Sequence, residues 1–275
     1  MKQRTRIVIA YDTLELLEKG SYNNSKNETV HFGAMQEKTI AGTRLYRPEE
    51  LDDLLLRDAA TTAAFETIYE VTNETTLDAA RRLAAAGEAD VLALNFASAK
   101  NPGGGFLDGA SAQEESIARA SGLYPSLLQG KEYYEYHRGQ GTCLYSDYMI
   151  YSPAVPVLKD EDGALLDRPV PVSVITSPAA NAGAIKNNEP ENERLIVSVM
   201  QQRTDKLLAV CAAHGHEVLV LGAWGCGVFR NDPEMIAKLF YEALNGHFKN
   251  RFRKVVFAVK TNKEAIIAPF QQYFM

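Results

Sequence analysis

Residues 91–115 read VLALNFASAKNPGGGFLDGASAQEE, and this stretch decides the fold of the chain. The apolar run near its start predicts a buried strand over 90–96. Gly103, Gly104 and Gly105 then allow the backbone to approach a ligand, and their amide groups can point at anionic oxygens. Ligands of open α/β sheets bind outside the carboxyl ends of strands, so a binding loop is favoured over a plain flexible connection.

A helix is predicted directly after this loop, over 113–121. Ser111 and Glu114 have the spacing of a capping box, with Ser111 as the N-cap. Glu115 is rotated from Glu114 by about 100° around the helix axis, so the two side chains are expected to point in different directions. On spacing alone, Glu115 is either a solvated acid favoured by the helix dipole or a functional carboxylate.

Strands and helices alternate from residue 66 onward, which predicts a layered α/β sheet. The predicted strands are 67–72, 90–96, 148–153, 170–177, 217–222 and 254–260. The predicted helices are 75–86, 113–121, 191–214, 233–245 and 263–270.

The first 65 residues have a different pattern. Helical spacing of apolar residues predicts a helix over 4–19, ended by Gly20, although Ile7–Ala10 alone would also suit a strand. Residues 21–45 are predicted to be loop or hairpin, and Pro48 opens another helix. We therefore expect a mainly helical extension, 1–65, packed on a core, 66–275, as one compact unit.

Charge and cysteine usage exclude several classes of protein. The 275 residues carry a net charge of −6 without a long basic run, which argues against general nucleic-acid binding. Cys143, Cys211 and Cys226 are far apart, so neither a disulfide framework nor a zinc site is expected, and no cofactor is implied. The chain shows no signal peptide and no membrane-spanning run, so the cytoplasm is expected, or the nucleus in a eukaryote.

A second glycine-rich turn, with Gly225, Cys226 and Gly227, follows the predicted strand 217–222. Either Asn231 or Asp232 can cap the next helix, with Pro233 at its first position. This arrangement again presents amide groups to a phosphate. Phe229 is either a core anchor or a stacking group, and aromatic statistics favour the core. Cys226 is expected to be a small filler, not a nucleophile.

Two further groups of residues have a structural and a functional interpretation. His214 and His216 flank Gly215, and surface histidines are favoured over a metal pair. The aromatic run Tyr133–Tyr136 is expected to combine helix packing with surface exposure, in preference to gripping an adenine.

The motif residues resemble a known family. The run 94–97, the three glycines and Gln113-Glu114-Glu115, separated from the glycines by 106–112, are similar to the signature of poly(ADP-ribose) glycohydrolases. The segments 41–46, 116–121 and 221–231 resemble the shorter microbial branch of that family, so the resemblance spans nearly the whole chain.

The resemblance implies a fold, an activity and partners. The fold is a macrodomain-like mixed β-sheet between helices, with an N-terminal helical extension. The activity is hydrolysis of ribose–ribose bonds in poly(ADP-ribose), in exo mode, reversing ADP-ribosylation in the DNA damage response. Poly(ADP-ribose) and ADP-ribosylated proteins are the implied substrates and ADP-ribose is the product. A monomer without direct DNA contact is expected.

The resemblance also assigns roles to residues. The second Glu of the family motif is catalytic, which corresponds to Glu115, and the first, Glu114, orients the substrate ribose. Asn95 stands where larger members carry Asp, and Ser98 where many macrodomains carry Asn, which leaves the ribose contacts open. The substrate-binding residues expected from the motif and the two loops are Asn95, Ser98, Asn101, Gly103, Gly104, Gly105, Gln113, Gly225, Cys226, Gly227, Val228 and Phe229.

The chemistry follows from this assignment. Adjacent, diverging glutamates fit the two-carboxylate template of glycosidases poorly, so one carboxylate, Glu115, is expected to act first as acid and then as base. This role requires a raised pKa, and the ligand's diphosphate would stabilise the cationic sugar. Two alternatives stay open: a non-catalytic reader of ADP-ribose, which has no need for Glu115, and a hydrolase of mono-ADP-ribosyl groups.

Overall fold

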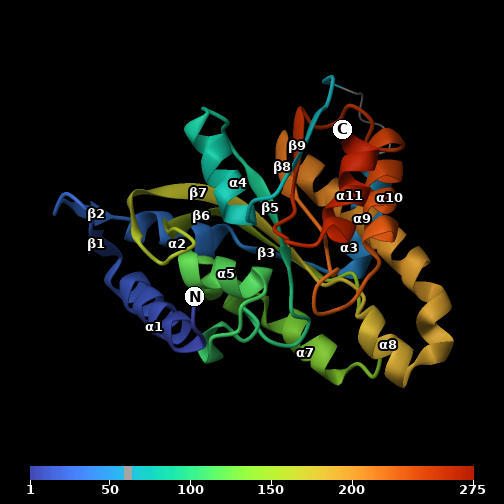
Figure 1. The fold of residues 1–275 in the computed structure, drawn as a ribbon, viewed down its shortest axis with the longest axis horizontal. Helices are drawn as coiled ribbons and strands as arrows, with labels where there is room; N and C mark the ends of the chain where they lie inside the picture. The colour runs from blue at the N-terminus through green and yellow to red at the C-terminus, as the bar shows by residue number, and fades with distance from the viewer. Residues whose placement is uncertain (59–63) are drawn as a thin grey trace.

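The computed structural model describes residues 1–58 and 64–275 and is built around a mixed seven-stranded sheet (Figure 1). The order across the sheet is β3 (Arg44–Tyr46), β6 (Met149–Lys159), β7 (Leu165–Ser177), β5 (Leu92–Phe96), β8 (Val218–Leu221), β9 (Lys254–Ala258) and β4 (Ile68–Thr72). Five neighbouring strands are parallel to one another, the next strand, β6, runs antiparallel to them, and the edge strand β3 pairs antiparallel with β6. The predicted mixed α/β class is confirmed.

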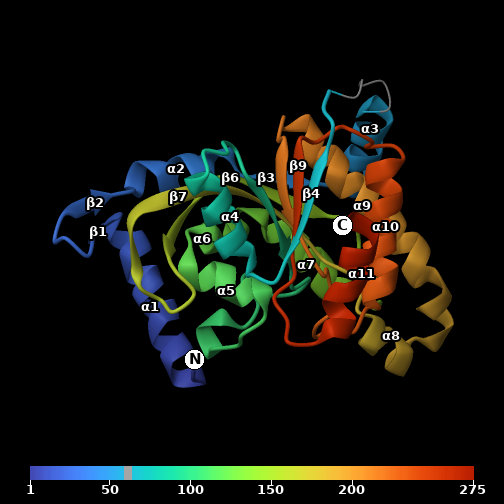
Figure 2. The same ribbon diagram turned by 45° about the horizontal axis from the view of Figure 1, so that its top comes forward.

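Helices cover both faces of this sheet (Figure 2). Strand β5 shows why: Leu92 and Leu94 enter one apolar cluster, while Val91 and Ala93 enter the other, so the strand is buried on both faces. One layer contains α3 (Pro48–Asp58), α9 (Ile196–Ala213), α10 (Pro233–Asn245) and α11 (Glu264–Phe274). The other contains α4 (Thr76–Ala85), α5 (Gln113–Ala120), α6 (Leu123–Leu127) and α7 (Lys131–Gly139).

The N-terminal region joins the sheet as well as covering it. Helix α1 (Gln3–Lys19) confirms the predicted helix and excludes the strand alternative, and Gly20 ends it with a φ of 65°. A small hairpin, β1 (Ser21–Asn23) with β2 (Thr29–His31), follows as predicted. The prediction of loop or hairpin up to residue 45 is wrong beyond this point, because α2 (Gly33–Gly42) and β3 come next.

Buried polar contacts explain α2, whose sequence carries little helical patterning. The Gln36 side chain donates to the carbonyl of Gly122 at 3.0 Å, and the Thr39 hydroxyl donates to that of Ala154 at 2.9 Å. These partners are remote in sequence, so the helix is stabilised by tertiary contacts. The division at 65/66 adjoins residues 59–63, which lie outside the described residues, and it stays a prediction.

Strands β6 and β7 are longer than predicted. Prolines normally interrupt a strand, and Pro153 marked the predicted end at 153. The ladder instead shifts register between Ser152 and Val155, with Ala154 at a φ of 45°. This bulge accommodates Pro153 and lets the hairpin continue to Lys159.

Two short helical segments complete the layers near α7 and α9: α8 (Ala182–Asn188) and the 3₁₀ segment η3 (Pro190–Leu195). The predicted helix 191–214 therefore begins as a 3₁₀ turn and becomes α-helical only at Ile196. Within the described parts of the chain, no helix combines the length and the apolar character needed to cross a membrane.

Candidate active site

A cavity of about 730 Å³ opens where β5 and β8 separate at their carboxyl ends. Strand β5 pairs with β7 along its whole length, but with β8 only at Leu92 and Ala93. Beyond Ala93 the two neighbours diverge, which is the kind of crevice where α/β sheets bind ligands. The sheet topology therefore creates the site.

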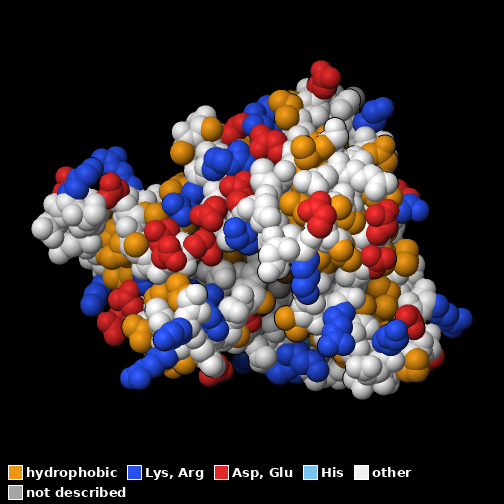
Figure 3. Space-filling model, in the orientation of Figure 1, with side chains coloured by type: hydrophobic (Ala, Val, Ile, Leu, Met, Phe, Trp, Pro, Cys, Tyr) orange, Lys and Arg blue, Asp and Glu red, His pale blue; other side chains and the backbone are white. Residues whose placement is uncertain are grey.

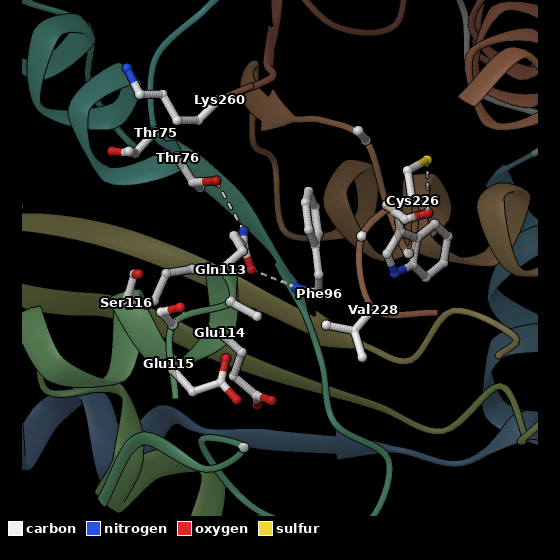
Figure 4. Close-up of a pocket in the computed structure, with 18 of the residues that line it drawn as sticks. Thr75, Thr76, Phe96, Gln113, Glu114, Glu115, Ser116, Cys226, Val228 and Lys260 are labelled. Atoms are coloured by element: carbon white, nitrogen blue, oxygen red, sulfur yellow. Dashed lines mark hydrogen bonds between the residues drawn. The ribbon is translucent and has the colours of Figure 1, made fainter. Parts of the chain in front are cut away.

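Gln113 satisfies the backbone groups that this separation leaves unpaired. Its Nε2 donates to the carbonyl of Leu94 at 2.7 Å and to the Thr76 hydroxyl at 3.0 Å. Its Oε1 accepts from the amide of Phe96 at 2.8 Å (Figure 4). Gln113 thus holds the edge of β5 open and fixes the start of α5, while it also lines the cavity. All three of these contacts are structural.

The triple-glycine loop holds the glutamates. The amide of Gly105 donates to Glu115 Oε1 at 3.0 Å, and the amide of Gly103 lies close enough to the carboxyl of Glu114 to oppose the rise of its pKa. The amide of Gly104 donates to the carbonyl of Asn101 at 3.0 Å. We expected these amides to face anionic oxygens, and two of them do, but the oxygens belong to the protein's own side chains.

Glu114 is buried at the base of the cavity, with 3% of its surface exposed. Its Oε1 accepts from Asn95 Nδ2 at 3.2 Å, and its Oε2 accepts from the amide of Ser98 at 2.6 Å. Burial raises the pKa of Glu114 to about 8, and the neighbouring charge of Glu115 adds to this rise. The carboxyl group is therefore neutral near pH 7.

The predicted capping box is wrong. Ala112 is the N-cap of α5 and no side chain caps the helix, so Ser111 does not have this role. Glu114 is unavailable to the helix end because Asn95 and Ser98 bind its carboxyl in the opposite direction. Tertiary contacts outweigh a local motif that sequence spacing alone favours.

The two glutamates converge instead of diverging (Figure 4). A Cβ atom placed on Gly104 would lie 2.3 Å from Glu115 Oε1 and 3.3 Å from Glu114 Oε2. Long side chains bend back toward one point, although their Cα–Cβ bonds differ by about 100° around the helix. Glu115 Oε2 is buried at the cavity wall without a hydrogen-bond partner among the described residues. This oxygen therefore has an unused hydrogen-bonding capacity beside the cavity.

The second glycine loop has a different hydrogen-bonding state. Gly225 has a φ of 73°, and the turn is closed by the amide of Cys226, which donates to Ala223. Within the described chain, the amides of 227–229 donate to no protein acceptor. Asp232, not Asn231, caps α10 by accepting from the amide of Glu234 at 3.0 Å. Free amides and a helix N-terminus together suit a phosphate.

The side chains of this second loop line the cavity. Phe229 is half-buried, packs against the main apolar cluster and approaches the Tyr145 ring at 6.1 Å, so it is both a core residue and a wall of the site. Val228 is 76% exposed at the rim. Burial raises the pKa of the Cys226 thiol to about 12, which fits a filler and not a nucleophile.

The remaining predicted residues divide into two groups. Ser98 and Asn101 line the cavity, and the Ser98 hydroxyl accepts from the amide of Asn101 at 3.1 Å. Asn95 is fully buried behind Glu114, and Gly103 faces the ring of Phe106. Neither of these two lines the cavity, so they act through the residues that do.

Several lining residues were not predicted from the sequence. Phe96, at the end of the predicted strand, lies against Gly222 and forms one wall, and the Lys260 end of the cavity, which comes from other segments, is remote from the glutamates (Figure 4). Residues from the start of α4, from the end of β9 and from the β6–β7 turn complete the lining: Glu74, Thr75, Thr76, Glu161, Lys260 and Thr261. The rule that strand ends meet at one edge would have found those on α4 and β9.

The aromatic run and the histidines serve packing. Tyr133 and Tyr134 are buried while Tyr136 is exposed, as predicted. His214 is exposed and stacks on Tyr151, whereas His216 is buried and bonds the Tyr151 hydroxyl, so the prediction of two surface histidines is wrong for His216. In the described part of the chain, no group of three His, Cys, Asp or Glu residues has an arrangement that could hold a metal ion.

A search of curated proteins returned no match, whereas solved structures similar to this chain agree with its geometry. A poly(ADP-ribose) glycohydrolase structure from Thermomonospora curvata is 47% identical, with a TM-score of 0.94 over 98% of this chain and 100% of that one. The same organism's enzyme bound to the inhibitor ADP-HPD is 46% identical, with a TM-score of 0.90 over 98% and 99%.

A third similar structure and a family model complete the comparison. The Deinococcus radiodurans enzyme in complex with ADP-ribose is 46% identical, with a TM-score of 0.83 over 86% of this chain and 96% of that one. The family model "Microbial-type PARG, catalytic domain" matches residues 10–160. The chain therefore belongs to the microbial-type poly(ADP-ribose) glycohydrolase (PARG) family, which confirms the resemblance seen in its sequence.

Proposed function

We propose that this glycohydrolase cleaves ribose–ribose O-glycosidic bonds of poly(ADP-ribose) and releases ADP-ribose from chain ends, with Glu115 as the catalytic acid. The observation that carries the proposal is the state of the Glu115 carboxylate. The Gly105 amide fixes Oε1, and Oε2 is buried at the cavity wall without a protein partner. The binding of ADP-ribose to the Deinococcus relative supports the choice of ligand.

The cavity offers a separate place for each part of the ligand. The free amides of 227–229 suit the diphosphate, because the cavity wall also carries Glu74, Glu161 and the glutamate pair and so gives an anion few other partners. The reacting ribose then lies toward Glu115, and the adenosine lies toward Lys260 at the opposite end. Phe96 and Phe229 supply apolar walls between them.

Hydrolysis then needs one proton transfer in each direction. Glu115 gives its proton to the leaving 2′ oxygen as the bond from that oxygen to C1″ breaks. Water adds its hydroxyl to C1″ and returns a proton to Glu115. The diphosphate on the free amides stabilises the cationic sugar between these steps. Glu114, which burial keeps neutral near pH 7, orients the ribose hydroxyls.

Exo cleavage is supported by the way α1 braces one end of the cavity. Ile9 of α1 contacts Gly163 in the β6–β7 turn, whose Glu161 lines the cavity. Gln3 and Ile7 contact Gly109 beside the catalytic loop. These contacts let the N-terminal helix support the segments that carry Glu161 and the triple-glycine loop, which supports a closed end beyond which a chain has little room to pass. Free ADP-ribose, without longer fragments, is the expected early product from long chains.

The test separates the three functions that the sequence left open. The protein is incubated with poly(ADP-ribose) of defined length and, separately, with mono-ADP-ribosylated protein, and the products are identified by mass spectrometry. Free ADP-ribose from the chains, with the last protein-linked unit retained, is expected. Binding without release would indicate a reader, and release from the mono-modified protein alone would indicate the other hydrolase.

Three predictions about the cellular setting accompany this function. The protein acts as a monomer, in the cytoplasm or a nucleus, and reverses ADP-ribosylation in the DNA damage response without direct DNA contact. The net charge of −6 supports the absence of DNA binding. Size-exclusion chromatography with light scattering tests the oligomeric state.

A further inference from the structure

Four cations lie beside the two loops that line the cavity: Lys100, Arg138, Arg230 and Lys186. Lys100 directly precedes Asn101, and Arg230 directly follows Phe229, and both of these neighbours line the cavity. All four side chains are exposed. Figure 3 shows Lys and Arg side chains gathered along the lower edge of the molecule, in the region of α7 and α8.

Backbone contacts bring these cations together. Arg138 donates to the carbonyl of Lys100 at 2.7 Å. Burial raises the pKa of the Cys143 thiol, and the nearby charge of Lys100 opposes this rise, so Lys100 lies close to Cys143. The carbonyl of Cys143 accepts from Asn181 at the start of α8.

The same helix reaches the other pair of cations. The amide of Gly183 in α8 donates to the carbonyl of Phe229, and a Cβ placed on Gly183 would lie 3.0 Å from Arg230 Cδ. Lys186 lies one turn further along α8. The four cations therefore form one border, which we call the basic border, beside the catalytic end.

The cations of the basic border are not neutralised by carboxylates of the described chain. In residues 1–58 and 64–275, none of its four members forms an ion pair with a carboxylate. Glu189 lies nearby, but its carboxylate accepts from the Thr142 hydroxyl at 2.6 Å and from the Cys143 amide at 2.7 Å. Among the described residues, the rest of the lining combines Glu74 and Glu161 with a single lysine, Lys260, so this end carries the larger group of cations in a chain of net charge −6.

We infer that the basic border binds the leaving part of the poly(ADP-ribose) chain, through the diphosphates that follow the cleaved bond. This inference rests on the proposed function. The bond to be cleaved lies at Glu115, which contacts Gly104, and the loop continues from there to Asn101 at the rim. The leaving chain must emerge from that end, and each of its units carries a diphosphate. Unpaired cations there attract the polymer and hold it for cleavage.

The experiment compares two substrates that differ only in the leaving group. One is poly(ADP-ribose), and the other is an ADP-ribose aryl glycoside with an uncharged phenol at C1″. For the double variant Lys100→Glu/Arg138→Glu, kcat/KM on the polymer is expected to fall about tenfold at low salt, and the loss should shrink as salt rises. Turnover of the aryl glycoside and the Kd for ADP-ribose should stay within about twofold, since rim charges act mainly on charged partners.

Two further variants make the comparison decisive. Lys38→Glu/Lys249→Glu changes the net charge equally at exposed sites on α2 and after α10, and it should leave polymer turnover near the wild-type value. Lys100→Gln/Arg138→Gln should give a smaller, about threefold loss, and it replaces the charge reversal if that variant does not fold.

Three results bear on the two proposals separately. The proposal for the basic border would be overturned if the control variant Lys38→Glu/Lys249→Glu lost as much kcat/KM on the polymer as Lys100→Glu/Arg138→Glu. It would also be overturned if Lys100→Glu/Arg138→Glu lost as much kcat/KM on the aryl glycoside as on the polymer. A wild-type protein that releases no ADP-ribose from the polymer, yet cleaves the aryl glycoside, would instead overturn the proposed function.

Discussion

The two glycine loops of the cavity look alike in sequence and differ in what their amides bind. Each follows a buried strand and leads into a helix. In the first loop, the amide of Gly105 donates to Glu115 and the amide of Gly103 faces the carboxyl group of Glu114. In the second, the amides of 227–229 have no protein acceptor within the described chain.

A glycine-rich loop after a strand can hold carboxyl groups of the protein or bind phosphates of a ligand, and the two loops differ in which of these they do. The first loop holds the carboxyl groups of Glu114 and Glu115, and its glycines allow the close approach that this needs. The second loop keeps its donors for the ligand's phosphates. A glycine-rich loop at a strand end therefore indicates an anion site, but only the hydrogen bonds show whether the anion belongs to the protein or to the ligand.

The largest effect expected from breaking this comparison comes from Gly104→Ala. Gly104 has a φ of 60°, and a methyl group there would lie 2.3 Å from Glu115 Oε1. The displaced carboxylate loses its alignment, so kcat on poly(ADP-ribose) should fall about 100-fold or more. The Kd for ADP-ribose, measured by calorimetry, should change only a few-fold. Gly141→Ala, at a glycine with open space around it, is the control.

Gly225→Ala is expected to affect the binding of ADP-ribose more than kcat, the opposite of Gly104→Ala. Gly225 has a φ of 73°, and a methyl group would meet Asn231 Nδ2 at 2.4 Å and Ala179 Cβ at 2.6 Å. The loop must move, so its amides no longer converge, and the Kd for ADP-ribose should rise about tenfold. If Gly225→Ala lowered kcat while leaving the Kd unchanged, the division of tasks between the two loops would be wrong.

The smallest effect concerns the pH dependence of stability. The pKa of Glu114 is raised to about 8 in the folded chain, so the folded state binds more protons than the unfolded state between pH 4.5 and 8. The free energy of unfolding should therefore contain a contribution that is fully present below pH 4.5 and is lost as pH rises to about 8.

Glu114→Gln isolates this contribution, because the amide does not titrate. Urea unfolding of both proteins at several pH values should show a steeper decline for the wild type across that window. Parallel curves would contradict the neutral, buried state of Glu114.

The sequence was sufficient for those parts of the molecule whose signals are local. The buried strand β5, the glycine loop and α5 follow from an apolar run, three consecutive glycines and helical spacing, and they bring Glu115 to the site. Asp232 and Pro233 likewise define the start of α10 by local capping chemistry.

The rest depends on contacts between remote segments. Glu114 faces Asn95 and Ser98 instead of its own helix end, and the cavity exists because β5 and β8 separate after Ala93. Lys260 and Thr75 line the same cavity as the glutamates only because of the order of the strands in the sheet. No local pattern encodes these distances, so spacing misassigned Glu114 and missed one end of the cavity.

The most direct test of the central claim is the rate of ADP-ribose release from poly(ADP-ribose) by Glu115→Gln, with the Kd for ADP-ribose measured on the same sample. Glu15→Gln, at an exposed position on α1, is the matched control. The rate should lie at least about 10³-fold below wild type, because the general acid is lost, and the Kd should stay within a few-fold. A near-wild-type rate for Glu115→Gln would contradict the central claim.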